Sequence, residues 1–198
     1  MGLLQRAKEL TRKPKDYDEV RFENGNTDDI IELVRYADSE AAKERLCKEF
    51  APLLRGKTDF ETVKNTWLFV RNEIPYKADT AGYERVRLPN KCIWDAYRYS
   101  DGGDCKTFCT LTTDLLRENG IDSLIRFISQ TWVKKARHVY NVAIVNGEEV
   151  PCDGVHKVFN ENPTYVYKWD FKAVPSKKTA ISKIRGLNTE GSKNYTIF

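Results

Sequence analysis

The segment 101–121 decides the fold, and it reads Asp-Gly-Gly-Asp-Cys-Lys-Thr-Phe-Cys-Thr-Leu-Thr-Thr-Asp-Leu-Leu-Arg-Glu-Asn-Gly-Ile. Its apolar residues recur at intervals of three and four, which predicts a helix that begins at Cys105. Asn119 and Gly120 follow the last apolar pair and predict the end of that helix. The two glycines before the helix let the backbone turn sharply into it. We therefore expect Cys105 to lie accessible at a helix N-terminus.

A thiol at this position gains reactivity from the helix. A cysteine attacks as its thiolate, and a free thiol with a pKa of about 8.5 is only slightly ionised at neutral pH. Unpaired backbone N–H groups and the positive end of the helix dipole stabilise an anion at a helix start. Cys105 is therefore the candidate nucleophile.

A cysteine nucleophile needs a histidine base, and the chain has two histidines, His138 and His156. His138 opens the apolar run 138–145, which is separated from the run 148–152 by Asn146-Gly147. This dipeptide is the strongest signal for a type I′ hairpin. His156 falls after the second strand, where no carboxylate is arranged for it.

The hairpin also supplies a carboxylate. With Asn146 and Gly147 as turn residues, Tyr140 faces Asp153, so Asp153 is a diagonal neighbour of His138, roughly 5 to 8 Å away on the same face. A carboxylate there would fix the tautomer of the imidazole and stabilise its charged form. The sequence thus predicts a site built from Cys105, His138 and Asp153.

The remaining segments predict an α+β fold. Thr58 to Glu61 form a capping box, which starts a helix over 59–73 with Phe60, Val63, Trp67 and Val70 on its buried face. Helical patterns also cover 30–34 and 41–50, strands are expected at 124–128, 138–145, 148–152 and 165–169, and 77–100 is expected to be a long loop with a short helix.

Five motifs together resemble the transglutaminase-like domain of the papain-like cysteine hydrolase clan, of the bacterial or phage type. They are Gly103-Asp104-Cys105, the leucine-rich helix ending at Asn119-Gly120-Ile121, His138-Val139-Tyr140, Val150-Pro151-Cys152-Asp153, and the helix with Trp67 followed by Ile74-Pro75-Tyr76. The resemblance covers about residues 55–160. It implies N-terminal helices and a nucleophile helix packed on an antiparallel sheet.

By this resemblance Cys105 is the nucleophile, His138 the base and Asp153 the acid that orients it. An oxyanion hole would use the Cys105 backbone N–H and one further donor. Three aromatic residues upstream are candidates for that donor, and the sequence does not choose between them: Trp67, Tyr76 and Trp94.

The function expected from these residues is acyl transfer from an amide bond of a protein or peptide. Resolution of the acyl-enzyme by water gives a peptidase or amidase, and resolution by an amine gives a transglutaminase. The alternative is a structural or interaction protein that retains the fold, such as a phage virion or assembly component held by its basic ends.

Charge is unevenly placed along the 198 residues. Residues 1–15 hold five Lys or Arg against one acid, and residues 171–198 hold six against one. We expect a basic polar arm (1–26), a single domain (27–170) and a basic tail (171–198), with the two ends available for protein assembly. Nucleic-acid binding through the segment from Lys172 to Lys193 is a third possibility, and it ranks last because no nucleic-acid motif accompanies the charge.

The five cysteines are odd in number and scattered, which disfavours a disulfide framework. Zinc-ligand spacing is lacking, so no metal or cofactor is expected. With no apolar run of 18 residues and no apolar leader, we expect no membrane span and a cytoplasmic protein, or a virion component if the chain is viral.

Overall fold

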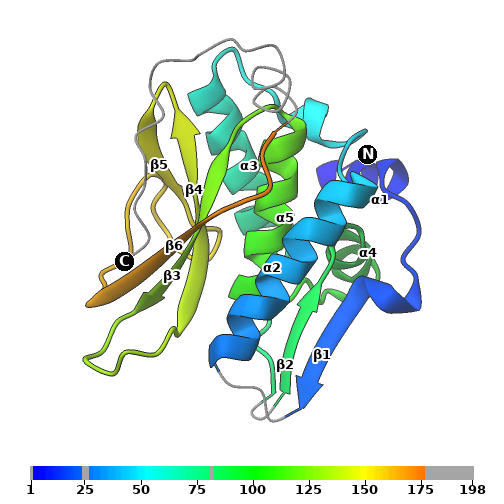
Figure 1. Ribbon diagram of the computed structural model, residues 1–198. Helices are drawn as coiled ribbons and strands as arrows, with labels where there is room; N and C mark the ends of the chain where they lie inside the picture. The colour runs from blue at the N-terminus through cyan, green and yellow to red at the C-terminus, as the bar shows by residue number, and fades with distance from the viewer. Residues whose placement is uncertain (1, 24–26, 81–82, 177–198) are drawn as a thin grey trace.

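The fold is built around helix α5 (Cys105–Glu118), which lies between a four-stranded sheet and the other helices (Figure 1). The computed structural model describes residues 2–23, 27–80 and 83–176. Twelve consecutive residues of α5, 106–117, are buried. The Asp104 side chain caps the helix by accepting hydrogen bonds from the backbone N–H groups of Lys106 (3.1 Å) and Thr107 (3.4 Å). The predicted helix is therefore confirmed, with Cys105 as its first residue.

The sheet is antiparallel throughout, with strand order β5-β4-β3-β6. Its strands are β3 (Ser123–Ser129), β4 (His138–Val145), β5 (Glu148–Cys152) and β6 (Tyr167–Lys172). Asn146 and Gly147 both have positive φ, 53° and 86°, as a type I′ turn requires. The register from Val145↔Glu148 to Asn141↔Cys152 confirms the predicted hairpin.

Helix α3 (Asp59–Glu73) begins and ends as predicted. Thr58 accepts from the Glu61 N–H at 3.1 Å, while the Glu61 carboxylate bonds to the N–H of Lys57, one residue before the expected cap. Val63, Trp67 and Val70 are buried, but Phe60 is 41% exposed and the prediction of its burial was wrong. The other helices are α1 (Leu3–Leu10), α2 (Thr27–Glu44), α4 (Pro89–Tyr99) and the short 3₁₀ turns η1 (Asp16–Asp18) and η2 (Ala51–Leu54).

Residues 3–23 do not form the expected arm. Ala7 of α1 is fully buried, and β1 (Glu19–Glu23) pairs antiparallel with β2 (Tyr83–Arg87), which lies in the segment expected to be a loop. Some of the charges that suggested an arm are paired with acids instead, as in the 2.6 Å ion pair between Arg12 and the buried Asp18. The prediction was wrong because β1 and β2 pair although they are distant in sequence, and local composition does not report such pairing.

The end of the domain also differs from the expected boundary at residue 170. Strand β6 continues to Lys172, Ala173 is buried, and the Val174 N–H donates to Asp38 at 2.8 Å. Most of the expected tail, residues 177–198, lies outside the described residues. None of the described helices has the length and apolar character needed to cross a membrane.

Candidate active site

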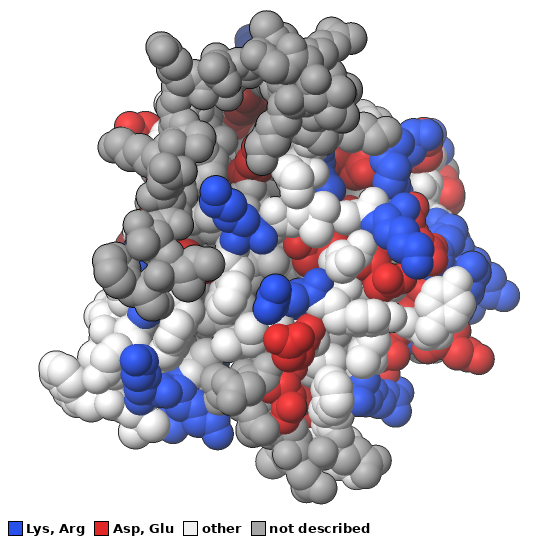
Figure 2. All heavy atoms as spheres, viewed as in Figure 1, with Lys and Arg blue, Asp and Glu red and all other residues white. Residues whose placement is uncertain are grey.

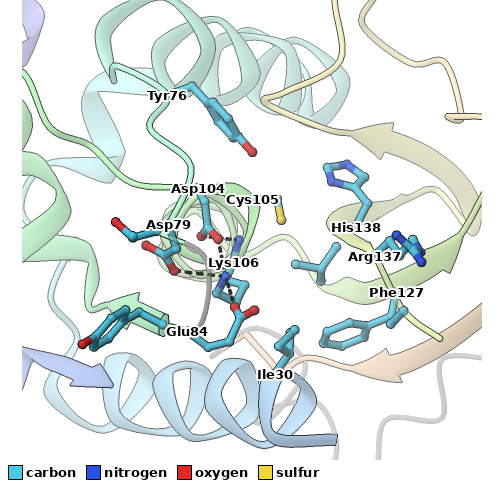
Figure 3. A pocket seen from close by; sticks show the side chains of 14 residues that line it. Ile30, Tyr76, Asp79, Glu84, Asp104, Cys105, Lys106, Phe127, Arg137 and His138 are labelled. Atoms are coloured by element: carbon cyan, nitrogen blue, oxygen red, sulfur yellow. Dashed lines mark hydrogen bonds and ion pairs between the residues drawn. The ribbon is translucent and has the colours of Figure 1, made fainter. Parts of the chain in front are cut away.

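A pocket of about 240 Å³ opens between the start of α5, the start of β4 and the segment that follows α3 (Figure 3). Cys105 and His138 both line it. The other side chains around it belong to Ile30, Tyr76, Asp79, Thr80, Tyr83, Glu84, Asp104, Lys106, Phe127, Ala136, Arg137 and Val139.

Cys105 differs from the other four cysteines in its exposure. All five thiols are free, but Cys105 is half-buried and the others are buried. The turn before it depends on Gly103, whose φ is +113°, and a Cβ at that position would lie 2.8 Å from the Thr107 side chain. Glycine at this position thus allows the chain to enter α5 with the Cys105 thiol at the wall of the pocket.

His138 and Asp153 meet across the hairpin. The His138 Nε2 atom lies 2.7 Å from Asp153 Oδ2, and the other carboxylate oxygen accepts from the Val155 N–H at 2.9 Å. Both Asp153 oxygens are thus bonded, and the residue is 4% exposed. The imidazole also stacks against Tyr140, with ring centroids 5.8 Å apart. Because Nε2 is engaged by Asp153, Nδ1 is the ring nitrogen left for Cys105.

The surroundings of His138 favour its charged form. Burial alone would lower its pKa, but the hydrogen bond to Asp153, the nearby Cys105 and the negative charge of both groups outweigh burial and raise the pKa to about 10. A histidine with such a pKa is an imidazolium at neutral pH. It can therefore stabilise a thiolate and later supply a proton.

The three oxyanion candidates are placed differently. Tyr76 lines the pocket, and Figure 3 shows its hydroxyl directed toward the Cys105 side of it. Burial and the charge of Cys105 raise the Tyr76 pKa to about 12, which keeps the hydroxyl protonated as a donor. Trp67 and Trp94 do not line the pocket. Of the three candidates, only Tyr76 lines the pocket.

Trp67 supports the site from behind. Its Nε1–H donates to the backbone carbonyl of Asp153 at 2.8 Å, which fixes the end of β5 against α3. Trp94 Nε1 is buried with no hydrogen-bond partner among the described residues. The two tryptophans therefore form a matched pair for measuring what this hydrogen bond contributes.

Trp67→Phe is expected to lower the free energy of unfolding by about 1–3 kcal/mol, because it leaves the buried Asp153 carbonyl without its donor. Urea titration of the wild type and of the Trp67→Phe variant would measure the change. Trp94→Phe removes an N–H that has no described partner and should cost less. Equal losses in the two variants would contradict the role given to the Trp67 hydrogen bond.

A charged cluster beside Cys105 was not predicted. The ammonium of Lys106, which is 4% exposed, bonds to Asp104, to Glu84 (2.7 Å) and to Asp79 (3.2 Å). Oxygen atoms of the three carboxylates lie within 4.8 Å of one another, as a metal site would need, and the Lys106 ammonium bonds to all three. Asp79 and Glu84 lie in the segment expected to be a loop, so no sequence signal placed them here.

Known proteins resemble this chain at two levels, a family of sequences and a solved structure. The sequence model of the transglutaminase-like superfamily matches residues 48–175, nearly two thirds of the chain. A solved structure from Cytophaga hutchinsonii, described as a "putative cysteine protease", is 15% identical with a TM-score of 0.43 and covers 75% of this chain. The chain spans 58% of the length of that protein. No curated protein matches the sequence.

Proposed function

The chain belongs to the transglutaminase-like superfamily, and on this premise we propose that it is a cysteine-dependent acyl-transfer enzyme that acts on amide bonds of proteins or peptides. The observation that carries the proposal is that Cys105 and His138 line the same pocket while Asp153 bonds to His138 from outside it. Cys105 is the one half-exposed thiol and stands at a helix N-terminus, and His138 beside it is held by Asp153 at 2.7 Å. The proposed roles are those of nucleophile, base and orienting acid.

The first half of the reaction forms an acyl-enzyme. The Cys105 thiolate attacks the amide carbonyl, and the Cys105 N–H and the Tyr76 hydroxyl donate to the oxyanion that develops. The imidazolium of His138 then gives its proton to the leaving amine as the C–N bond breaks. The Asp153 carboxylate holds the ring in place throughout.

The second half of the reaction regenerates the free enzyme. Neutral His138 takes a proton from water or from a second amine as that nucleophile attacks the thioester, and the Cys105 thiolate leaves. Water yields a carboxylic acid, as in a peptidase or amidase, and an amine yields a new amide, as in a transglutaminase.

The test is the rate at which iodoacetamide labels each cysteine between pH 4 and 9, read by peptide mass spectrometry. Below pH 7, Cys105 is expected to react faster than the four buried thiols by at least about tenfold, because its thiolate is paired with the His138 imidazolium. The His138 pKa, raised to about 10, keeps the imidazole charged over this pH range.

His138→Ala is the matched variant for this experiment. Without the imidazolium, labelling of Cys105 at pH 6 should fall to the rate of an ordinary exposed thiol, while labelling at pH 9 changes little. If Cys105 reacts as slowly as the buried cysteines in both proteins, the catalytic proposal fails, and a structural protein that keeps the fold becomes the better account.

A further inference from the structure

The two walls of the pocket carry opposite charge. On one side of Cys105 lie Asp79, Glu84 and Asp104 around a single lysine, Lys106, as Figure 3 shows. On the other side, beside His138, lies Arg137. A substrate that enters this pocket therefore meets an acidic wall and a basic wall, which lets charge set its orientation.

Arg137 belongs to the loop 130–137, which joins β3 to β4. The loop contains Lys134, Lys135 and Arg137 and no acidic residue. Figure 2 shows this corner, at the lower left, as blue and white atoms without red ones. The loop also exposes Trp132, at 84%, and Val133, at 57%.

Hydrogen bonds fix the base of the loop, so the backbone position of Arg137 is defined. The Arg137 N–H donates to the Ile128 carbonyl at 2.9 Å, and Ile128 pairs with His138 across β3 and β4. The Ser129 hydroxyl donates to the Val133 carbonyl at 2.8 Å. The backbone of Arg137 is thus fixed next to the site, and its side chain is exposed.

Among the residues that the structure describes, Arg137 has no carboxylate partner. It is exposed, and none of the acids in the described ranges lies within ion-pair distance of it, whereas Lys106 on the opposite wall has three carboxylate partners. A guanidinium that lines a pocket without an internal partner can donate two parallel hydrogen bonds to a ligand carboxylate.

We propose that Arg137 is a specificity-determining residue that binds a carboxylate of the acyl donor, so that the pocket selects amides flanked by an acidic side chain. The inference rests on the proposed acyl transfer and names its substrate class. Lys134 and Lys135 extend the positive surface along an acidic peptide, and Trp132 offers it an apolar contact. The carboxylates around Lys106 repel the same acidic group and so fix the direction in which the peptide lies.

The experiment uses three alkylating probes that differ in one charge: N-iodoacetyl-glutamate, N-iodoacetyl-glutamine and N-iodoacetyl-lysine, each as its amide. In each reaction the Cys105 sulfur bonds to carbon and iodide leaves. The second-order rate at Cys105 is measured by peptide mass spectrometry in the full chain. Wild type is expected to prefer the glutamate probe over the glutamine probe by about tenfold, the value of one charge-assisted hydrogen bond.

Two variants and one control test whether Arg137 causes the preference for the glutamate probe. Arg137→Gln should bring the glutamate-to-glutamine ratio to about one, and Arg137→Glu should reverse it in favour of the lysine probe. Lys64→Glu makes the same change in net charge at an exposed residue of α3, away from the pocket, and should leave the ratio unchanged. A wild-type ratio of one, or a ratio that Arg137→Glu does not move, overturns the inference.

The same data separate this inference from the proposed function. The rate with the neutral glutamine probe reports whether Cys105 is activated, and the ratio between probes reports selection by charge. A further measurement adds a single-stranded DNA oligomer as a competitor and compares it with poly-glutamate. If it protects Cys105 more strongly than poly-glutamate does, and Arg137→Glu abolishes that protection, the loop is a nucleic-acid surface and the peptide assignment is wrong.

Discussion

Cys105→Ala is expected to lower the acyl-transfer activity by about 10⁴-fold or more, since the group that forms the covalent intermediate is lost. The fold should survive, because Cys105 is half-buried at the first position of α5 and alanine suits a helix. Turnover of amide substrates would measure the loss, and circular dichroism with urea titration would check the fold. An alanine variant that keeps more than about a hundredth of the activity would mean that another group attacks the amide.

Cys109 provides the matched control for this prediction. It lies one turn further along α5, is 2% exposed and does not line the pocket. Cys109→Ala removes the same side chain from the same helix and should leave turnover unchanged at a small cost in stability. Cys105→Ser should be nearly as inactive as Cys105→Ala, because a hydroxyl is a far weaker nucleophile at this pH than a thiolate.

Lys106→Met is expected to have the largest effect on stability, a loss of about 3–5 kcal/mol in the free energy of unfolding. The substitution keeps the volume of the side chain but leaves Asp79, Glu84 and Asp104 close together without the ammonium that compensates them. Urea unfolding at pH 7 would measure the difference. Lys64→Met, which changes an exposed lysine of α3, should change the free energy by less than about 0.5 kcal/mol.

The pH dependence of this loss has a definite sign. Burial already raises the pKa of Asp104 against the opposing effect of Lys106, and removal of the ammonium raises that pKa further. A carboxyl whose folded-state pKa lies above the unfolded value destabilises the fold increasingly as the pH rises between the two values. The difference between Lys106→Met and wild type should therefore shrink from pH 8 to pH 4.5.

A compensating change distinguishes charge from packing in this cluster. Asp104→Asn keeps a side chain that can cap α5 and removes one of the three negative charges. The double variant Lys106→Met, Asp104→Asn should therefore be more stable than Lys106→Met alone. A double variant that is less stable, with the same loss at every pH, would show that packing and not charge explains the effect.

The sequence predicted those parts of the fold whose signals are local. The glycine pair, the apolar spacing and the Asn-Gly end are all properties of the segment 101–121, and α5 begins and ends where they place it. The hairpin register follows from two turn residues, Asn146 and Gly147, and it brings His138 and Asp153 to 2.7 Å of each other. Superfamily membership, inferred from the same motifs, is confirmed by the match over residues 48–175.

The parts that the sequence did not predict depend on pairing across long distances. Strands β1 and β2 are more than 55 residues apart, and each is rich in charged residues that local patterns assign to arms and loops. Lys106 was not predicted to be buried because a lysine at the start of a helix is normally solvated. Two of its partners, Asp79 and Glu84, lie just before and within β2, a strand that was not predicted. The choice of Tyr76 over Trp67 likewise needed side-chain directions, which spacing does not give.

The burial of α5 has a consequence for how this protein can change over time. Residues 106–117 are buried, so most substitutions there disturb the core and also the helix that positions the Cys105 thiol. The loop 130–137 is different, because most of its side chains are exposed and its conformation is held by backbone bonds at its base. Substrate preference can therefore diverge among descendants of this chain through the loop alone, while the chemistry stays tied to a helix that tolerates little variation.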